Sequence, residues 1–108
     1  MDFTIKTDDT GPALTVACTY SDGTVPDFTG AAGTFAMRNA VGTVIINDVA
    51  ATMVAPLTGG TVAYNWVAGD TLTAGDYTGE FHVTLESGKR VTCPNSDYLR
   101  IRIYEDVP

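Results

Sequence analysis

Residues 77–86 read YTGEFHVTLE, and this stretch decides the fold class of the chain. Polar side chains stand between the apolar ones at alternating positions, and the apolar set is Tyr77, Phe81, Val83 and Leu85. Successive side chains of a β-strand point to opposite faces of a sheet. The stretch therefore predicts a strand with one buried face and one face toward solvent.

The same alternation recurs at residues 14–20, 61–67 and 97–104. In the last of these stretches Arg100 and Arg102 are predicted to point outward. The first would bury Leu14, Val16, Cys18 and Tyr20. Shorter strands are predicted at Phe3–Lys6, Thr34–Arg38, Thr43–Asn47, Thr52–Ala55 and Lys89–Cys93. Gly, Pro or clustered Thr interrupts every window with helical spacing, so we predict no helix.

Many short strands, separated by turn residues every ~8–12 positions, predict an all-β fold. An antiparallel β-sandwich of two packed sheets is favoured over a closed barrel. Residues 26–33, rich in Gly, Ala and Asp, would make a poor barrel wall and are expected to form a loop or a ragged edge. A chain of 108 residues is expected to form a single domain over residues 1–108.

The composition is acidic, with 13 Asp and Glu against 6 Lys and Arg and a net charge of -7. This balance disfavours nucleic acid and anionic membranes as partners, because both attract basic proteins. No apolar run approaches the ~18 residues that cross a bilayer. The first residues, MDFTIKTDD, lack a basic region followed by an apolar run, so we expect synthesis in the cytoplasm.

Cys18 and Cys93 both fall on predicted inward faces. A disulfide between them and a pair of separate buried thiols are both compatible with the pattern, and Trp66 is available to pack against a bridge. Free thiols are favoured because no secretion signal precedes the first strand.

His82 is the only histidine, and it stands on the polar face between Glu80 and Thr84. It could be a base oriented by a carboxylate, but a solvent-exposed strand residue is favoured because no nucleophile motif accompanies it. Two cysteines and one histidine without close spacing do not predict a zinc site. Calcium held by loop carboxylates stays an alternative, although no DxDxDG spacing occurs. We predict no catalytic, cofactor-binding or metal-binding residues, and no cofactor.

Four of the six basic residues lie in the last twenty positions. If residues 77–86 and 98–104 form neighbouring strands, Arg100 and Arg102 could pair with Glu80 and Glu86 on the outer face. Alternatively, the same residues could form a charged docking face. Four aromatic residues could form a sugar-binding platform, but core packing is favoured because they alternate with polar residues; these are Tyr64, Trp66, Tyr77 and Phe81.

Several short motifs occur in a characteristic order: GTVAYNW at 60–66, AGDT at 68–71, AGDYTGEFHVT at 74–84, SGK at 87–89 and CPN at 93–95. Upstream, DFTGA at 27–31 is followed by FAMR at 35–38. Together these motifs resemble the immunoglobulin-like N-terminal domain of tailed-phage baseplate upper proteins and related phage structural proteins. The resemblance extends from about Phe3 to Val107. The family usually has an aromatic or aliphatic residue at the position of Cys93, so the resemblance implies no disulfide.

The resemblance implies an immunoglobulin-like sandwich that serves as a non-enzymatic structural protein of a virion. Such a protein would dock onto other virion subunits as a capsid decoration, neck, tail or baseplate component, in many copies within a symmetric assembly. Candidate contacts are Asp27, Phe28, Glu80, His82, Arg100 and Arg102. Turn residues that would determine the fold are Gly69, Asp70 and Gly75, where Asp70 is expected to bond the amides that follow it. The alternative function is a carbohydrate-binding module used in host attachment.

Overall fold

The computed structural model describes residues 2–94 and 98–107. Its elements follow in chain order as β1 (Asp2–Lys6), β2 (Leu14–Ala17), β3 (Ala32–Asn39), β4 (Val44–Val54), η1 (Leu57–Gly59), β5 (Thr61–Tyr64), β6 (Gly75–Thr84), β7 (Arg90–Cys93) and β8 (Leu99–Tyr104). Within these residues, no helix is long and apolar enough to span a membrane. Residue 97 of the predicted last strand and residue 95 of the CPN motif lie outside the described residues.

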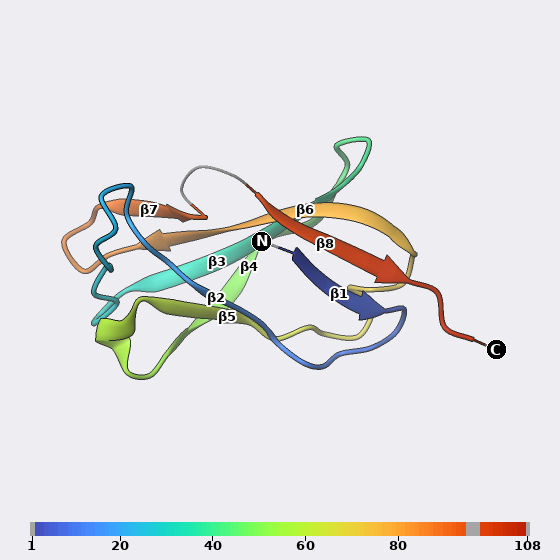
Figure 1. Ribbon diagram of the computed structural model, residues 1–108, viewed down its shortest axis with the longest axis horizontal. Coiled ribbons are helices and arrows are strands. Elements are labelled where there is room, and N and C mark those ends of the chain that lie inside the picture. The colour runs from blue at the N-terminus through green and yellow to red at the C-terminus, as the bar shows by residue number, and fades with distance from the viewer. Residues whose placement is uncertain (1, 95–97, 108) are drawn as a thin grey trace.

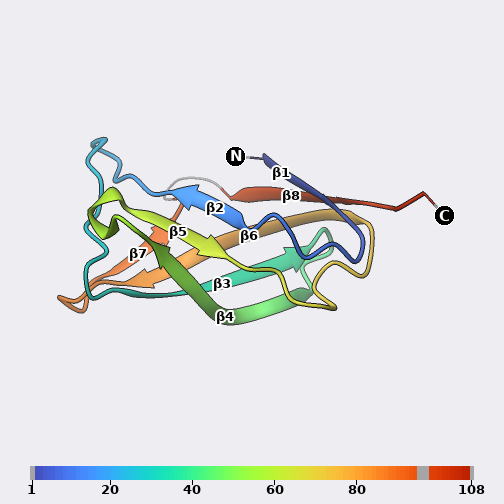
Figure 2. The ribbon, with the colours of Figure 1, turned by 90° about the horizontal axis from the view of Figure 1, so that it is seen from below.

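The strands form a large sheet and a small sheet that pack face to face (Figures 1 and 2). The large sheet contains β1, β8, β6, β3 and the first part of β4, with β7 also beside β6. The small sheet contains β2, β5 and the end of β4. All pairs are antiparallel except β1 with β8, which are parallel. The predicted all-β, immunoglobulin-like sandwich is confirmed.

Strand β4 belongs to both sheets, which corrects the prediction of two separate strands at Thr43–Asn47 and Thr52–Ala55. Its first part pairs with β3, and Thr52–Val54 pairs with β5. Asp48 lies in the left-handed region at φ 49°, and the β3 register shifts near it. A bulge of this kind bends a strand without ending it. Asn47 and Asp48 are turn-forming residues, which is why the sequence suggested a break.

Strand β6 is the centre of the large sheet. One of its edges pairs with β3 along its length, while the other pairs first with β8 and then with β7. The predicted inward residues Tyr77, Phe81 and Val83 are buried. They are separated by even numbers of positions, which places their side chains on one face of the strand. Gly79 shares that face, where an added Cβ would come within 3.0 Å of the Phe35 ring.

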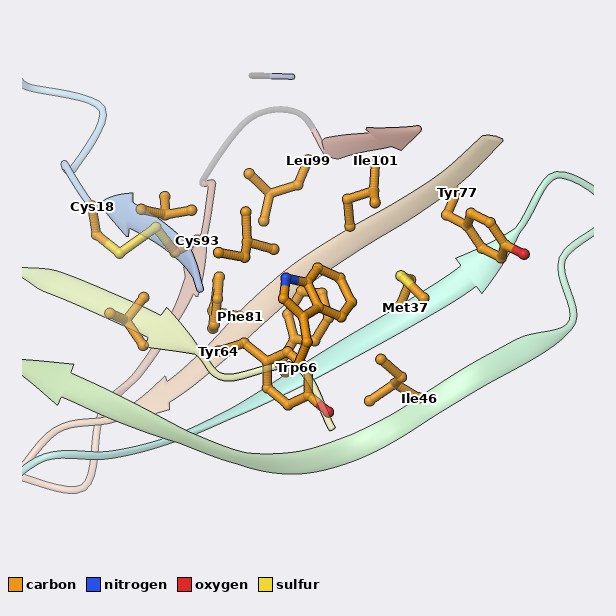
Figure 3. Packing of buried hydrophobic residues seen from close by; sticks show 14 of the residues in the cluster. Cys18, Met37, Ile46, Tyr64, Trp66, Tyr77, Phe81, Cys93, Leu99 and Ile101 are labelled. Atoms are coloured by element: carbon orange, nitrogen blue, oxygen red, sulfur yellow. A yellow bond between two sulfur atoms is a disulfide. The ribbon is translucent and has the colours of Figure 1, made fainter. Parts of the chain in front are cut away.

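The core between the sheets contains a group of aromatic rings in contact with one another (Figure 3). Phe35 stacks on Tyr64 with ring centroids 4.7 Å apart and meets Phe81 at 4.9 Å. Trp66 meets the edge of Tyr64 at 5.3 Å. The favoured interpretation of the aromatic set as core is therefore confirmed, and a sugar-binding platform on these buried rings is wrong. Tyr20, predicted to face inward, is 37% exposed because it lies beyond the end of β2.

Cys18 and Cys93 form a disulfide, so the expectation of free thiols is wrong. Cys18 follows β2 of the small sheet, while Cys93 ends β7 of the large sheet, and their Cα atoms are 5.7 Å apart. The bond thus links the two sheets across the core (Figure 3). A cross-link that closes so long a loop contributes about 4 kcal/mol in the chain-entropy account.

Candidate docking surface

The side of the large sheet that points away from the small sheet carries most of the basic residues, and we call it the outer face. Its charged side chains are Asp2, Lys6, Arg38, Asp48, Asp76, Glu80, Arg90, Arg100 and Arg102. This set includes five of the six basic residues and four of the twelve acidic residues that the structure describes. One basic and eight acidic residues are left for the rest of the described surface. The outer face is therefore nearly neutral on a strongly acidic molecule.

His82 lies on the outer face between two carboxylates. Its Nδ1 is 2.9 Å from Oδ1 of Asp48, and its Nε2 is 2.8 Å from Oε1 of Glu80. The His82 side chain is 18% exposed, so the prediction of a solvent-exposed residue is wrong. Both ring nitrogens are engaged by carboxylates, and a general base needs one of them free to face a nucleophile. The cluster joins β4 to β6 through the contact between His82 and Asp48.

Asp48 completes this cluster, although it is not among the site residues predicted from the sequence. It lies 34 positions from His82 and reaches it because of the bulge in β4. The hydrogen bond to His82 holds the pKa of the Asp48 carboxyl below its usual value. The Thr34 hydroxyl, which donates to the same oxygen at 3.1 Å, and the positive charge of Arg90 act in the same direction. No local sequence signal marks this contact.

Arg102 pairs with Asp76 at 3.2 Å, and its guanidinium lies 5.2 Å from the centre of the Tyr104 ring. The expected neighbouring strands are confirmed, since β6 and β8 pair with Asp76 opposite Arg102. The acidic partner differs from the predicted one. Glu80 bonds His82 on its own strand, while Glu86 lies beyond the end of β6. The register between β6 and β8, which the sequence alone does not fix, determines which acidic residue lies opposite Arg102.

Two hollows lie side by side on the outer face. One, of about 470 Å³, lies along β1, β8 and β6, and the other, of about 440 Å³, lies between β3, β4 and β6. Thr78 and Ala40 line both of them. Ala40 belongs to the hairpin between β3 and β4, which rises past β6 on the side away from β2 and β5 (Figure 1). The half-exposed rings of Tyr104 and Tyr98 line the first and second hollow, respectively.

The predicted turn residues have structural roles. Gly69 and Gly75 have φ of 98° and 151°, which L side chains rarely adopt. Asp70 accepts hydrogen bonds from the Tyr64 hydroxyl at 2.6 Å and from the Val67 amide at 2.9 Å. It thus bonds residues that precede it, which corrects the expected direction. Burial, together with the bond to Asp70, raises the pKa of Tyr64 above its usual value.

The loop before β3 contains the other two predicted contact residues. Asp27 is exposed, and its carboxylate accepts bonds from the amide and the hydroxyl of Thr29 at 2.9 and 2.7 Å. Phe28 is only 1% exposed, which contradicts its prediction as a contact residue. Its amide donates to the Leu57 carbonyl at 2.9 Å, and this bond draws the loop onto the core. Of the remaining predicted contacts, Glu80, His82, Arg100 and Arg102 share the outer face.

No protein-family model and no curated protein matches the chain. Among solved structures, CopC from Methylosinus trichosporium OB3b is similar, with a TM-score of 0.55 and 11% sequence identity. The alignment covers 97% of this chain and 85% of CopC. At this identity the likeness supports the β-sandwich fold and carries no argument about function.

Proposed function

We propose that the chain is a non-enzymatic structural protein of a tailed-phage virion that docks onto other virion subunits through its outer face. The motif resemblance supports the virion assignment. The observation that carries the choice of face is the charge distribution, because the outer face is nearly neutral while eight of the other nine charged residues described are acidic. With basic and acidic side chains interspersed, this face can pair with charged groups of either sign on a partner.

The side chains of the outer face are of the kinds that protein interfaces favour. Arg and Tyr are enriched at interfaces and among the residues that contribute most to binding. Here Arg100, Arg102 and Tyr104 come from β8, with Tyr98 just before it. The Arg102 guanidinium is already held by Asp76 and Tyr104, so less side-chain freedom is lost when a partner binds.

The partners in this proposal are other virion proteins, met in many copies within a symmetric particle. The proposal covers a capsid decoration, neck, tail or baseplate position alike. The protein would be made in the host cytoplasm and end in the virion. The Cys18–Cys93 disulfide agrees with that destination, since disulfides persist on virion surfaces.

The test uses particles of the phage or prophage whose genome encodes the chain. Density-purified particles should contain the protein, detected by antibody, and its absence from them would overturn the proposal. A phage from which the gene has been deleted can be supplied with either variant during assembly. Its particles should incorporate Lys89→Glu and should incorporate Arg102→Glu poorly. Both variants reverse one exposed basic residue, but Lys89 lies in the turn before β7 and away from the outer face. Equal incorporation of the two variants would show that docking does not use the outer face.

One observation favours the carbohydrate-binding alternative. The second hollow places the Tyr98 ring among polar groups that include Arg38 and Glu80. An aromatic ring beside a few polar groups is a usual composition for a small-ligand site. A glycan array should then give binding that Tyr98→Ala abolishes and that the matched variant Tyr104→Ala leaves intact. An array without binding would exclude this function.

A further inference from the structure

The hairpin between β3 and β4 presents an apolar side chain on a well-fixed turn. Val41, at its tip, is 86% exposed. The Asn39 carboxamide oxygen accepts bonds from the amides of Val41 and Thr43 at 3.1 and 2.9 Å, and Gly42 has φ 93°. A turn fixed in this way loses little conformational entropy when its tip is buried. Val41 is thus a pre-ordered apolar side chain at the tip of the hairpin, and Figure 1 shows that this hairpin rises past β6.

A hollow of about 470 Å³ lies beside the hairpin. It is lined along β8 by Arg100, Arg102 and Tyr104, and Ala40, the neighbour of Val41, forms part of its edge. The stems of arginine side chains and a tyrosine ring present apolar surface while their polar ends reach water. A protrusion and a hollow therefore lie next to each other on one face.

A protrusion beside a hollow permits a twofold contact in which the protrusion of each copy enters the hollow of the other. In such a contact, residue i of one copy meets residue j of the other and the reverse contact also forms. The charges of the outer face suit it as well, because five basic and four acidic side chains are interspersed there. The acidic residues elsewhere on the described surface would oppose one another if two copies met through those regions.

Direct pairing of β4 strands from two copies is less suitable. Within the described residues, no strand pairs with the second edge of β4 between Val44 and Ala51. However, the β3–β4 register shifts on both sides of Met37, and Asp48 lies in the left-handed region. Bulges of this kind twist an edge strand and hinder the addition of another strand.

We infer that two copies of the chain pair through their outer faces about a twofold axis, with Val41 of each copy in the hollow along β1, β8 and β6 of the other. This self-contact does not rest on the proposed function, and because it covers the same outer face, a copy paired in this way would not dock onto another virion subunit through that face. A monomeric protein found in virions would overturn the dimer alone. A dimer absent from virions would overturn the proposed function alone.

Sedimentation velocity of the full chain over a concentration series tests the inference. The wild type should dimerise, and Val41→Glu should raise the dimer dissociation constant by about tenfold or more. Val107→Glu is the matched control, since Val107 is 83% exposed, lies beyond β8 and gains the same charge. A wild type that stays monomeric up to about 100 μM overturns the inference. Equal effects of Val41→Glu and Val107→Glu on the dimer dissociation constant would also overturn it.

Cross-linking locates the contact. The only two cysteines form the disulfide, so a benzophenone maleimide added to Val41→Cys labels position 41 alone. Irradiation should yield a cross-linked dimer whose linked peptides come from β1, β6 or β8. Linkage to β2 or β5, or the absence of a cross-linked dimer, would show that Val41 does not enter the hollow.

Discussion

The two faces of β6 differ in how their side chains find their partners. The inner face, with Tyr77, Phe81 and Val83, packs against a core gathered from both sheets. The outer face carries Asp76, Glu80 and His82, whose contacts are single pairs at defined distances. Apolar burial is non-directional and scales with area, whereas the Asp76–Arg102 and His82–Asp48 pairs depend on how their strands are placed relative to one another. Stability should therefore reside on the inner face and recognition on the outer one.

The largest test of this comparison removes an inner ring. Phe81 is fully buried and meets Phe35, so Phe81→Ala should lower the free energy of unfolding by about 3–5 kcal/mol through lost burial and a residual cavity. On the outer face of the same strand, Thr78→Ala should change it by less than about 0.5 kcal/mol. Urea denaturation measures both values. Comparable losses would contradict the division between the faces.

The disulfide adds a covalent link to the inner face. Replacing both partners, Cys18→Ala with Cys93→Ala, should cost about 2–5 kcal/mol, because the unfolded chain regains the freedom that the bond removes. Denaturation with and without a reductant provides the measurement. The wild type should weaken under reductant by a similar amount, while the double variant should not respond to it. A wild type that is insensitive to complete reduction would show that the bond contributes nothing.

A smaller inner-face effect comes from a single added methyl group. At Gly79 a Cβ would lie 3.0 Å from ring atoms of Phe35 and from Cδ1 of Ile101, so Gly79→Ala should destabilise the fold by about 1–3 kcal/mol. Gly59→Ala is the control. Its added Cβ would come no closer than 3.8 Å to Pro56, an ordinary contact. Thermal melts that shift equally for both variants would refute crowding at Gly79.

The inner face was predictable from the sequence because burial follows local alternation. Tyr77, Phe81 and Val83 were identified from their spacing alone. The failures share a cause, which is contact between segments far apart in the chain. The disulfide joins residues 75 positions apart. The loop that contains Phe28 is held against the core by a hydrogen bond to Leu57, which no local sequence pattern predicts.

The candidate site was less predictable for the same reason. Arg100 and Arg102 were placed on the outer face by alternation, but their partners depend on strand register. Asp48 was missed as a partner of His82 because its orientation comes from a left-handed residue within a strand. A polar pair in a sheet is fixed by which strands are neighbours, and one sequence contains that information only weakly.

The smallest expected effect concerns the titration of Asp48 on the outer face. A hydrogen bond from His82 lowers the pKa of this carboxyl in the folded protein. The unfolded chain therefore binds a proton at Asp48 at a higher pH than the folded one. The stabilising contribution is present above the unfolded pKa, and it is lost as the pH falls through the lower, folded pKa. His82→Ala should raise the Asp48 midpoint in a carbon-detected NMR titration, since it removes the principal cause of the shift.

Thr34→Val provides the graded control for this titration. It removes the weaker bond to the same oxygen, at 3.1 Å, and should raise the Asp48 midpoint by less than His82→Ala does. Both variants should leave the unfolding free energy at neutral pH nearly unchanged, because the carboxyl is largely exposed and solvent screens the pair. An Asp48 midpoint that ignores His82→Ala would show that the cluster does not form in solution. A large loss of unfolding free energy at neutral pH would instead show that the outer-face contacts contribute to stability as much as core residues do.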